Sequence, residues 1–440
     1  MANGMRQMAA GFILVALLTF MRILNIQGQT ESITSRSSSV RPATADAVVP
    51  FKIRVADAVL ADLKQRLSRA RFADEIPDAG WDYGTNAASL EELVVYWRDK
   101  FDWRLQERRL NQFSQFKTNI DGLDIHFIHQ RSSIENATPL LLLNGWPSSM
   151  MEYAKVIAPL ADPVGHGGRA EDAFHVVIPS MPGYGFSDKP RERGYSPERI
   201  AGMWPKLMAR LGYSRYAVQG SDWGIAVATH LALRDAEHII ALHLNGCPGG
   251  APSQPGSATA GNPPSQTTLA NAGYQEIQST KPQTLGHGLS DSPAGLASWI
   301  MDKWHAWSDH DGDIEKVYTK DELLTNITVY WVTNSATSSS RLYYESRHVN
   351  GRLLATFFEG FLPPLPQGRV NLPTGCGVFP SQYDRRGNPA NMDPSVGRRA
   401  AEARYNVVYY TISPRGGLFA ALEQPTLWVD DVRAFLRNRR

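Results

Sequence analysis

The chain is poor in the residues that build metal centres and disulfide frameworks. Among its 440 residues there are only two cysteines, Cys247 and Cys376. Two cysteines allow one disulfide or none, and they do not make a metal-binding framework. The sequence also has no GxGxxG, P-loop, HExxH or CxxC motif. It therefore predicts no cofactor and no metal.

The chain also lacks an excess of charge of either sign. Its formal net charge is +2 at pH 7, so composition predicts neither a nucleic-acid partner nor a polybasic membrane-binding surface. We find no internal repeat in the sequence. Apolar residues make up 42% of the chain, which is enough for a large core, and the length allows two or three domains.

The N-terminus carries an apolar run unlike the rest of the chain. Met8 to Phe20 is apolar apart from Thr19, with Arg22 soon after it. The run is short for a membrane span, which needs about 20 residues, and it fits a signal peptide. Alternatively it is an uncleaved anchor, extended by Ile23 to Ile26. Both alternatives predict the secretory pathway, as an endoplasmic reticulum membrane protein or a secreted one.

Two tripeptides match the N-glycosylation acceptor motif. They are Asn136-Ala-Thr and Asn326-Ile-Thr. Both are compatible with a glycoprotein of the secretory pathway.

Hydrophobic periodicity changes along the chain. Helical spacing of apolar residues over 55–67 and 89–101 predicts an N-terminal helical arm. Asp121-Gly122 between two β-like runs predicts a hairpin. Predicted strands then alternate with predicted helices, which indicates a doubly wound, mostly parallel sheet. The predicted strands lie at 139–143, 174–178, 216–218 and 239–244, and the predicted helices at 199–211 and 225–233.

A helical block interrupts this alternation, as an inserted lid would. Residues 248–268 are rich in Pro, Gly and Ser, and helical patterns follow from Ala270 to about Trp331. The sheet pattern resumes near Asn371, and an amphipathic helix covers 427–436. The division we predict is 1–28 signal peptide or anchor, 29–48 linker, 49–115 helical arm, 116–247 first part of the α/β core, 248–368 loop plus helical lid, and 369–440 second part of the core.

The most informative stretch is Gly220-Ser221-Asp222-Trp223-Gly224, between a predicted strand and a predicted helix. A nucleophile elbow needs small residues two before and two after the nucleophile, because the turn is tight and strained. The pattern fails when centred on Ser221 and fits when centred on Asp222. A carboxylate nucleophile attacks saturated carbon, so epoxides and alkyl halides are suitable substrates. An N-capping aspartate is the alternative.

The loop Leu143-Asn144-Gly145-Trp146-Pro147 follows a predicted buried strand. In this type of fold such a loop supplies one backbone N–H to an oxyanion hole, and the residue after the nucleophile supplies the other. The sequence therefore predicts an oxyanion hole made by Trp146 and Trp223. A plain Gly-Pro turn is the alternative.

Several strings resemble the microsomal epoxide hydrolase family, which includes juvenile hormone epoxide hydrolases. They are NGWPSS at 144–149, IPSMPGYGFSDKP at 178–190, GSDWG at 220–224, TKPQTLGHGLSDSPAGLASWI at 280–300, PTGCGVFP at 373–380 and PRGGLFAALEQP at 414–425. The resemblance covers residues 50 to 436. It implies an α/β-hydrolase fold with an inserted helical lid and an N-terminal meander, which is the helical arm.

The resemblance also implies a two-step mechanism and its residues. Asp222 matches the family's nucleophile, and Tyr274 and Tyr343 match the two lid tyrosines that protonate the epoxide oxygen. A phenol suits that task because it can donate a proton without carrying charge. In the family, a histidine oriented by an acid then activates the water that hydrolyses the ester.

The sequence departs from the family at the positions that activate water. Leu418 stands where the family's R-G-G-H-F-A-A string has histidine. Gln382 stands where the family has the supporting acid, and Asn144 replaces the first histidine of the usual H-G-W-P. Losing a catalytic base typically costs about 10²–10⁴-fold in rate. An ester on Asp222 is therefore expected to hydrolyse slowly.

Three hypotheses remain open from the sequence. In the first, the enzyme opens the epoxide of a hydrophobic substrate by cyclisation or isomerisation without net hydrolysis, as in secondary metabolism. In the second, it is a true epoxide hydrolase giving a vicinal diol with a relocated base. In the third, it is a non-catalytic binder of hydrophobic ligands, although a binder has little reason to keep a costly buried carboxylate.

The second hypothesis needs replacement groups, and the substrate needs an apolar site. The available acids are Asp384, Asp393 and Glu402, and the available bases are His287, His305, His310 and His348. The lid tryptophans either pack the lid or line a site for a bulky lipophilic epoxide. They are Trp299, Trp304, Trp307 and Trp331. The sequence does not predict the oligomeric state.

Overall fold

The computed structural model describes residues 46–247, 266–349, 352–353, 368–379 and 394–439. These residues belong to one compact unit, Thr44–Arg440. The predicted N-terminal signal or anchor lies outside the described residues, as do Gln382, Asp384 and Asp393. Within the described part of the chain, no helix is both long and apolar enough to cross a membrane.

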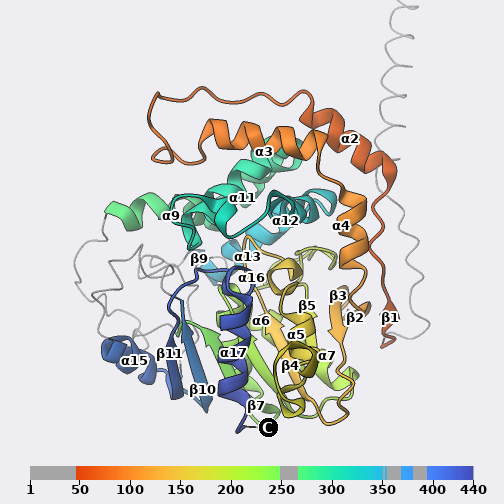
Figure 1. Cartoon of the computed structure of the whole chain (residues 1–440), viewed down its shortest axis with the longest axis vertical. Coiled ribbons are helices and arrows are strands. Elements are labelled where there is room, and N and C mark those ends of the chain that lie inside the picture. Colours follow the sequence, from red (N-terminus) through yellow and green to blue (C-terminus); the bar gives the residue numbers. More distant parts are fainter. Residues whose placement is uncertain (1–45, 248–265, 350–351, 354–367, 380–393, 440) are drawn as a thin grey trace, which may run out of the picture. The chain divides into compact units, whose positions relative to one another are not determined.

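The core is a nine-stranded sheet in the order β1-β2-β3-β5-β4-β6-β7-β10-β11 (Figure 1). The six strands from β5 to β11 are parallel to one another, whereas β1 pairs antiparallel with β2, β2 with β3, and β3 with β5. The bounds are β1 Val49–Pro50, β2 Gln115–Ile120, β3 Leu123–Gln130, β4 Thr138–Leu143, β5 Phe174–Pro179, β6 Tyr216–Gly220, β7 Ile239–Asn245, β10 Val370–Val378 and β11 Tyr405–Ile412. This is the predicted mostly parallel sheet of an α/β-hydrolase fold.

Both faces of the sheet are buried, which explains why β4 is apolar at successive positions. Leu141 and Leu143 join one hydrophobic cluster, and Leu140 and Leu142 join the other. A parallel strand covered on both faces reads as a continuous apolar run because alternate side chains enter different cores. The covering helices are α5 Ile157–Ala161, α6 Pro197–Ala201, α7 Trp204–Arg210, α8 Trp223–Arg234, α15 Pro394–Glu402, α16 Ala420–Glu423 and α17 Pro425–Leu436.

A helical lid stands between β7 and β10 in the sequence. Its helices are α9 Gln266–Thr280, α10 Pro282–Asp291, α11 Pro293–Trp307, α12 Lys320–Val332 and α13 Ala336–Arg347. A two-stranded ladder, β8 His348–Val349 with β9 Arg352–Leu353, follows it. The lid is longer than the helical pattern predicted, because α13 follows Trp331 after a short turn. The signal of α13 was weak, since its sequence ATSSSRLYYESR has few apolar residues.

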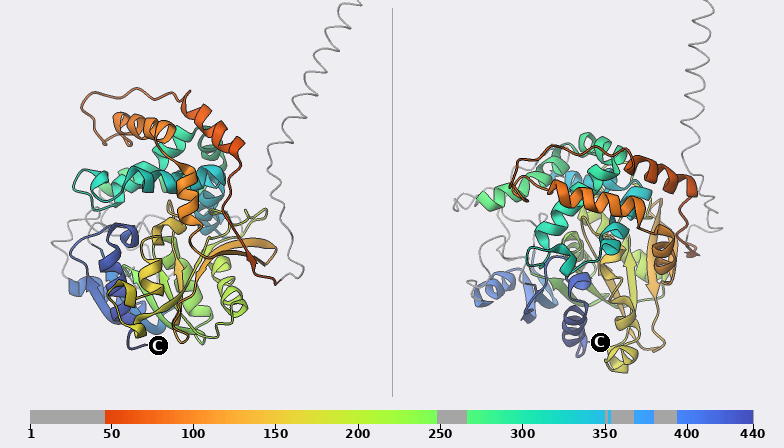
Figure 2. Two further views of the ribbon diagram at one scale, coloured as in Figure 1. Left: turned by 45° about the vertical axis from the view of Figure 1, so that its right-hand side comes forward. Right: turned by 45° about the horizontal axis from the view of Figure 1, so that its top comes forward.

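The helical arm packs against the lid. It consists of α2 Asp57–Leu67, α3 Ala87–Asp99 and α4 Trp103–Leu110. In Figure 2, α2 and α3 lie alongside the lid helices. Long-range hydrogen bonds and an ion pair join the arm and the lid. The Thr85 hydroxyl donates to the Ser298 carbonyl oxygen, Tyr96 donates to Asp321, and Arg66 pairs with Asp291. The arm therefore braces the lid from the side away from the sheet.

The predicted single helix over 199–211 is wrong. The structure has two short helices, α6 and α7, which separate at Gly202 and Met203. Pro205 lies in the first turn of α7, where its missing N–H costs nothing, but it could not continue a helix arriving from α6. The apolar spacing continues across the break because both helices bury their apolar residues in the same hydrophobic cluster.

The two cysteines form a disulfide. Cys247, just after β7, is bonded to Cys376 in β10. The bond joins the two chain segments that flank the lid insertion, and it closes a loop of 129 residues in sequence.

The two glycosylation motifs differ in exposure. Asn136 is exposed on the loop before β4. Asn326 is fully buried in α12, where its side-chain nitrogen donates to the Pro147 carbonyl oxygen and its oxygen accepts from the Ser149 hydroxyl. A glycan on Asn326 is incompatible with this fold, so the prediction fails at that position. Glycosylation of Asn136 stays a prediction.

Candidate active site

Asp222 lies at the turn from β6 into α8 with a strained backbone. Its φ is 50° and its ψ is −123°, a conformation that non-glycine residues rarely adopt. The Ser221 N–H donates to the Leu143 carbonyl oxygen, and the Ile225 N–H donates to that of Asp222. This is the strand–turn–helix setting expected for a nucleophile elbow.

The flanking glycines are required because backbone atoms crowd the elbow. A Cβ on Gly224 would lie 1.9 Å from the Leu143 carbonyl oxygen, and a Cβ on Gly220 would lie 2.6 Å from that of Gly224. Gly145 faces the carboxylate itself, since a Cβ there would lie 1.9 Å from Asp222 Oδ1. The glycines thus bring the 144–147 loop and the elbow into contact.

Backbone N–H groups hold the Asp222 carboxylate. The Trp146 N–H donates to Asp222 Oδ1 at 2.8 Å, and the Trp223 N–H also donates to this carboxylate. Burial raises the pKa of Asp222 to about 6, and the two backbone hydrogen bonds oppose that rise. The N–H groups of Trp146 and Trp223, predicted to form the oxyanion hole, therefore both point at the predicted nucleophile.

Tyr274 and Tyr343 meet above the elbow. Both are buried, and their ring centroids are 5.9 Å apart. The Tyr274 ring stacks on Trp146 at 5.3 Å, and Tyr343 packs edge-on against Trp223 at 4.6 Å. Burial raises the pKa of Tyr343 well above its usual range, so it stays a neutral phenol at any ordinary pH. The structure thus brings the predicted nucleophile, oxyanion-hole residues and tyrosines into one site.

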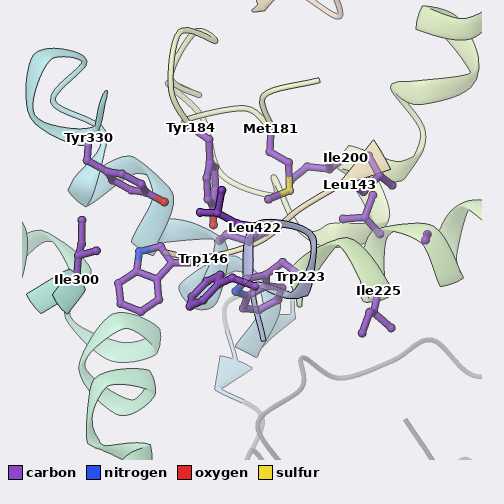
Figure 3. Packing of buried hydrophobic residues seen from close by; sticks show 14 of the residues in the cluster. Leu143, Trp146, Met181, Tyr184, Ile200, Trp223, Ile225, Ile300, Tyr330 and Leu422 are labelled. Atoms are coloured by element: carbon purple, nitrogen blue, oxygen red, sulfur yellow. The ribbon is translucent and has the colours of Figure 1, made fainter. Parts of the chain in front are cut away.

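Two further tyrosines from different elements lie near Asp222. Figure 3 shows Tyr184 and Tyr330 in the same cluster as Trp146 and Trp223. Tyr330 donates to the Ser148 carbonyl oxygen at 2.8 Å, and Tyr184 donates to that of Ser339. The Asp222 charge contributes to raising the pKa of both tyrosines. The carboxylate is therefore surrounded mainly by aromatic rings.

A buried cation lies beside Tyr274. Lys303 of α11 is only 6% exposed, and its Nζ lies 5.0 Å from the centroid of the Tyr274 ring and 5.9 Å from that of Trp307. Asp302 pairs with the Lys303 ammonium. A cation held against an aromatic face is attracted by it, more strongly where water is excluded. Lys303 was not predicted as a site residue; the usable signal was its position between two lid tryptophans, Trp299 and Trp304.

Leu418 lies in a tightly held segment between β11 and α16. It is partly buried against the hydrophobic cluster that contains Trp146, Tyr274 and Trp307, and its N–H donates to the Trp307 carbonyl oxygen at 2.9 Å. Glu423 fixes this segment by accepting from the N–H groups of Phe419 and Asp309. Burial raises the pKa of Glu423 to about 7.

The candidate replacement histidines contact other lid and arm groups. His305 stacks on Trp81 of the arm at 3.7 Å, and His310 hydrogen-bonds to the His305 carbonyl oxygen. His348 stacks on Tyr344, and His287 is exposed. The acid Glu402 pairs with Arg398 on α15. The contacts of these five residues are thus ring contacts, hydrogen bonds and an ion pair with groups of the lid, the arm and α15, or solvent exposure in the case of His287.

The lid tryptophans divide between packing and the site. Trp307 packs against Tyr274 and Trp146, with ring centroids 5.2 Å and 6.3 Å away. Trp304 stacks on Phe419, Trp299 donates to Gln278, and Trp331 lies under the Arg66 guanidinium. Trp307 therefore belongs to the site, and the other three pack the lid.

One cluster of potential metal ligands occurs among the described residues, and it lies away from the elbow. Asp235, Glu237 and His238 precede β7, whereas Asp222 follows β6. Because β6 and β7 are parallel, the metal-ligand cluster and Asp222 lie at opposite ends of these strands. Asp235 already accepts hydrogen bonds from Tyr216 and His238.

The sequence reasoning missed a second buried carboxyl group, Glu152. It lies in a 3-10 helix, Met150–Tyr153, directly behind the elbow, and it is 2% exposed. Burial raises the pKa of Glu152 to about 7. The usable signal was an acidic residue within a mostly apolar stretch, MMEYAKVIAPL at 150–160, whose other charged residue is Lys155.

The sheet order and the elbow define an α/β-hydrolase, and comparison with known proteins gives the family. Residues 48–153 match the model of the epoxide hydrolase N terminus, and residues 138–291 match that of the alpha/beta hydrolase fold. The chain is 36% identical to epoxide hydrolase 1 of Sus scrofa, over 90% of each protein. The chain belongs to the epoxide hydrolase family and is an epoxide hydrolase-like enzyme.

Solved structures agree with this assignment. The juvenile hormone epoxide hydrolase of the silkworm Bombyx mori superposes with a TM-score of 0.74 at 31% identity, covering 90% of this chain and 94% of that one. The Aspergillus niger epoxide hydrolase superposes with a TM-score of 0.72 at 28% identity, covering 90% and 97%.

Proposed function

We propose that this enzyme opens the epoxide of a hydrophobic substrate without net addition of water, by cyclisation or isomerisation. The observation that carries the proposal is Leu418 at the position where the family has its water-activating histidine. A leucine side chain cannot accept a proton. Leu418 instead extends the apolar wall of the cluster around Trp146 and Tyr274.

The remaining groups suffice for ring opening. Tyr274 donates its proton to the epoxide oxygen as the C–O bond breaks, and Tyr343 hydrogen-bonds to the same oxygen. A hydroxyl group of the substrate attacks the ring carbon and gives its proton to the Asp222 carboxylate. That proton then returns to the Tyr274 phenolate, so the product is an isomer of the substrate.

The hydrogen bonds on Tyr274 suit a proton donor. Gln275 donates to the Tyr274 hydroxyl oxygen at 3.0 Å, a hydrogen bond that also stabilises the phenolate left when Tyr274 gives up its proton. Trp146, Trp223, Trp307 and the two tyrosines form aromatic surroundings that favour a bulky, lipophilic epoxide.

The second candidate function is true epoxide hydrolysis to a vicinal diol with a relocated base. Its support is the family itself, since the relatives are named epoxide hydrolases. It requires a group that activates water in place of Leu418.

We also propose that the protein works in an oxidising compartment of the secretory pathway. The support is the Cys247–Cys376 disulfide, since such bonds persist in oxidising environments. The apolar N-terminal run fits the same location.

The decisive experiment is turnover of candidate epoxides in ¹⁸O-water. The expected product is isomeric with the substrate and free of label. A labelled diol formed at catalytic rates would contradict the proposal and support the second candidate. The Asp222→Asn variant is the control, because ring opening that persists in it does not come from this site.

Restoring the water-activating pair provides the converse test. The Leu418→His, Gln382→Glu double variant is expected to form labelled diol at least about tenfold faster than the natural chain, because a base typically supplies 10²–10⁴-fold. Gln382→Glu alone is the matched control and should form none. A double variant that stays inert as a hydrolase would show that these positions do not hold the missing base.

A further inference from the structure

Glu152 bridges the two backbone segments that hold Asp222. Its Oε1 accepts from the Ser221 hydroxyl at 2.7 Å, and its Oε2 lies 2.6 Å from the Ser148 hydroxyl. Ser221 immediately precedes Asp222, and Ser148 follows the loop whose Trp146 N–H holds the Asp222 carboxylate. One side chain therefore connects the elbow to the loop from behind.

A proton on Glu152 would complete a continuous chain of hydrogen bonds through Ser148. The Ser148 oxygen accepts from the Asn144 amide at 3.0 Å, and it also lies 3.1 Å from the Gly145 carbonyl oxygen. The Gly145 carbonyl oxygen also accepts from the Asn144 amide, at 3.3 Å. A hydroxyl has one proton, so beside an ionised Glu152 the Ser148 hydroxyl donates to the carboxylate, and Gly145 keeps only the longer bond from Asn144. If Glu152 carries a proton on Oε2, it donates to Ser148, and Ser148 donates to Gly145. All four groups are then satisfied.

The surroundings of Glu152 also favour the neutral form. Burial is the main cause of its raised pKa of about 7; the hydrogen bonds from Ser148 and Ser221 oppose the rise, and the negative charges of Asp222 and Glu423 add to it. Tyr153, Tyr318 and Tyr330 are the other titratable groups that interact with it, and burial keeps all three neutral. A buried ionised acid beside Asp222 would repel the carboxylate.

We propose that Glu152 is a positioning residue that acts as a neutral acid, tying Ser221 to Ser148 so that the Trp146 N–H stays aligned with Asp222. The Asn144 amide belongs to the same network. Asn144, which replaces the first histidine of the H-G-W-P string, therefore has a structural role in this network. The proposal rests on the proposed function only in that Asp222 is taken as the reacting carboxylate.

The proposal predicts activity in a narrow pH window. Asp222 must be ionised, which requires a pH above its pKa of about 6. Glu152 must be protonated, which requires a pH below its pKa of about 7. Epoxide consumption should therefore rise through pH 6 and decline above pH 7, a bell-shaped profile set by two carboxyl groups.

The test compares Glu152→Gln with Glu152→Leu in epoxide consumption across pH. Glutamine is neutral at every pH and can donate to Ser148 while accepting from Ser221. Glu152→Gln should keep kcat within about threefold at pH 6.5 and lose the decline above pH 7. Glu152→Leu should lower kcat by about tenfold with little change in KM, since it removes both hydrogen bonds.

Glu423→Gln is the matched control, because Glu423 is also buried with a pKa of about 7 but contacts Phe419 and Asp309 instead of the elbow. It should retain the alkaline decline. The proposal is overturned if Glu152→Gln keeps that decline, or if it loses as much activity as Glu152→Leu. If Glu152→Leu does not fold, the pH profile of Glu152→Gln decides alone.

An infrared measurement separates this proposal from the proposed function. The difference spectrum between the natural chain and Glu152→Gln at pH 6 should show the C=O band of a buried carboxylic acid. Its absence would overturn the neutral-acid assignment whatever the enzyme does with epoxides. Conversely, an Asp222→Asn variant that consumes epoxide normally would refute the proposed function and leave the infrared result standing.

Discussion

Asp222 combines three unfavourable features in one residue. Its backbone lies at a positive φ, its carboxyl group is buried, and its side chain meets mainly aromatic rings. The N–H groups of Trp146 and Trp223 offset part of the loss of hydration. Such a residue weakens the fold, and it is expected where a reactive group must be kept poorly solvated.

The destabilisation caused by the buried, ionised Asp222 carboxylate can be measured with the Asp222→Asn variant. The pKa of Asp222 is raised from 3.8 to about 6, so the folded state holds the proton more tightly than the unfolded state. The stability conferred by the protonated form is present at low pH and is lost as pH rises through 6. At pH 8, Asp222→Asn should therefore raise the free energy of unfolding by roughly 2–3 kcal/mol.

Urea denaturation at pH 8 and pH 5 checks this expectation. The difference between the variant and the natural chain should shrink at pH 5, where the natural carboxyl group is largely protonated. An Asn variant that is less stable at both pH values would show that the carboxylate is well compensated in the fold.

Sequence reasoning identified the residues whose signal is local. The Gly–x–Asp–x–Gly spacing reports a steric requirement that the structure shows directly, at Gly220 and Gly224. Lys303 and Glu152 were missed because their importance comes from burial, which depends on α11 and the 3-10 helix docking against distant segments. Trp307 and Ser148 are close in sequence to Lys303 and Glu152, respectively, but Tyr274 and Ser221 come from distant segments.

At the scale of elements, the elbow depends on the close approach of β4 and α8. Gly224→Ala should lower the free energy of unfolding by more than about 3 kcal/mol, because its Cβ would overlap a main-chain oxygen that cannot rotate away. Gly288→Ala in α10 is the matched control. It has no neighbour within 4 Å and should be neutral or stabilise by up to about 1 kcal/mol. Thermal unfolding of the two variants tests the difference, and equal effects would contradict the steric argument.

Helix α11 places Lys303 and Trp307 against Tyr274. When a phenol gives up its proton to an opening epoxide, negative charge develops on its ring, and a nearby ammonium stabilises it. Lys303→Met should therefore lower kcat by about tenfold, in line with a desolvated cation–π contact of about 2 kcal/mol. KM should change little. Steady-state kinetics on an epoxide substrate give both values.

Lys316→Met serves as the comparison, because Lys316 is exposed on the short helix Ile314–Lys316 after α11. It should leave both kinetic constants unchanged. Equal losses in the two lysine variants would mean that lid stability, and not charge beside Tyr274, explains the effect.

The sequence predicted the type of each helix or strand better than its bounds. The buried strands were identifiable because apolar runs between turn residues have few alternatives. The break between α6 and α7 and the presence of α13 were not predicted. Apolar spacing continues across the break between α6 and α7. Helix α13 is buried mainly through small polar residues such as Ser338 and Ser339.

At the scale of the whole molecule, the disulfide fastens the two ends of the lid insertion to neighbouring strands. Replacing both Cys247 and Cys376 by serine should lower the free energy of unfolding by roughly 2–4 kcal/mol, because the unfolded chain regains the freedom of a long loop. Denaturation of the double variant, and of the natural chain with and without a reductant, checks this. A reductant that has no effect on the natural chain would contradict it.

The predicted α/β-hydrolase fold was correct because it depends on the order of strands and helices along the whole chain. Alternating strands and helices leave few topologies for a parallel sheet, and the sequence strings at the strand ends identify the family. The pairing of Cys247 with Cys376 and the contact between the arm and the lid could not be predicted, because they depend on how distant segments are arranged in space.

Because Asn326 is buried in the folded protein, folding and N-glycosylation at this residue exclude each other. In a cell compartment that attaches glycans to emerging chains, Asn326-Ile-Thr is an acceptor only until α12 docks on the Pro147 loop. In a molecule glycosylated at Asn326, α12 could no longer pack on the loop that contains Pro147 and Ser149. Secretion from a eukaryotic host should therefore yield active protein bearing a glycan at most on Asn136, and any Asn326-glycosylated fraction should be inactive and retained by quality control.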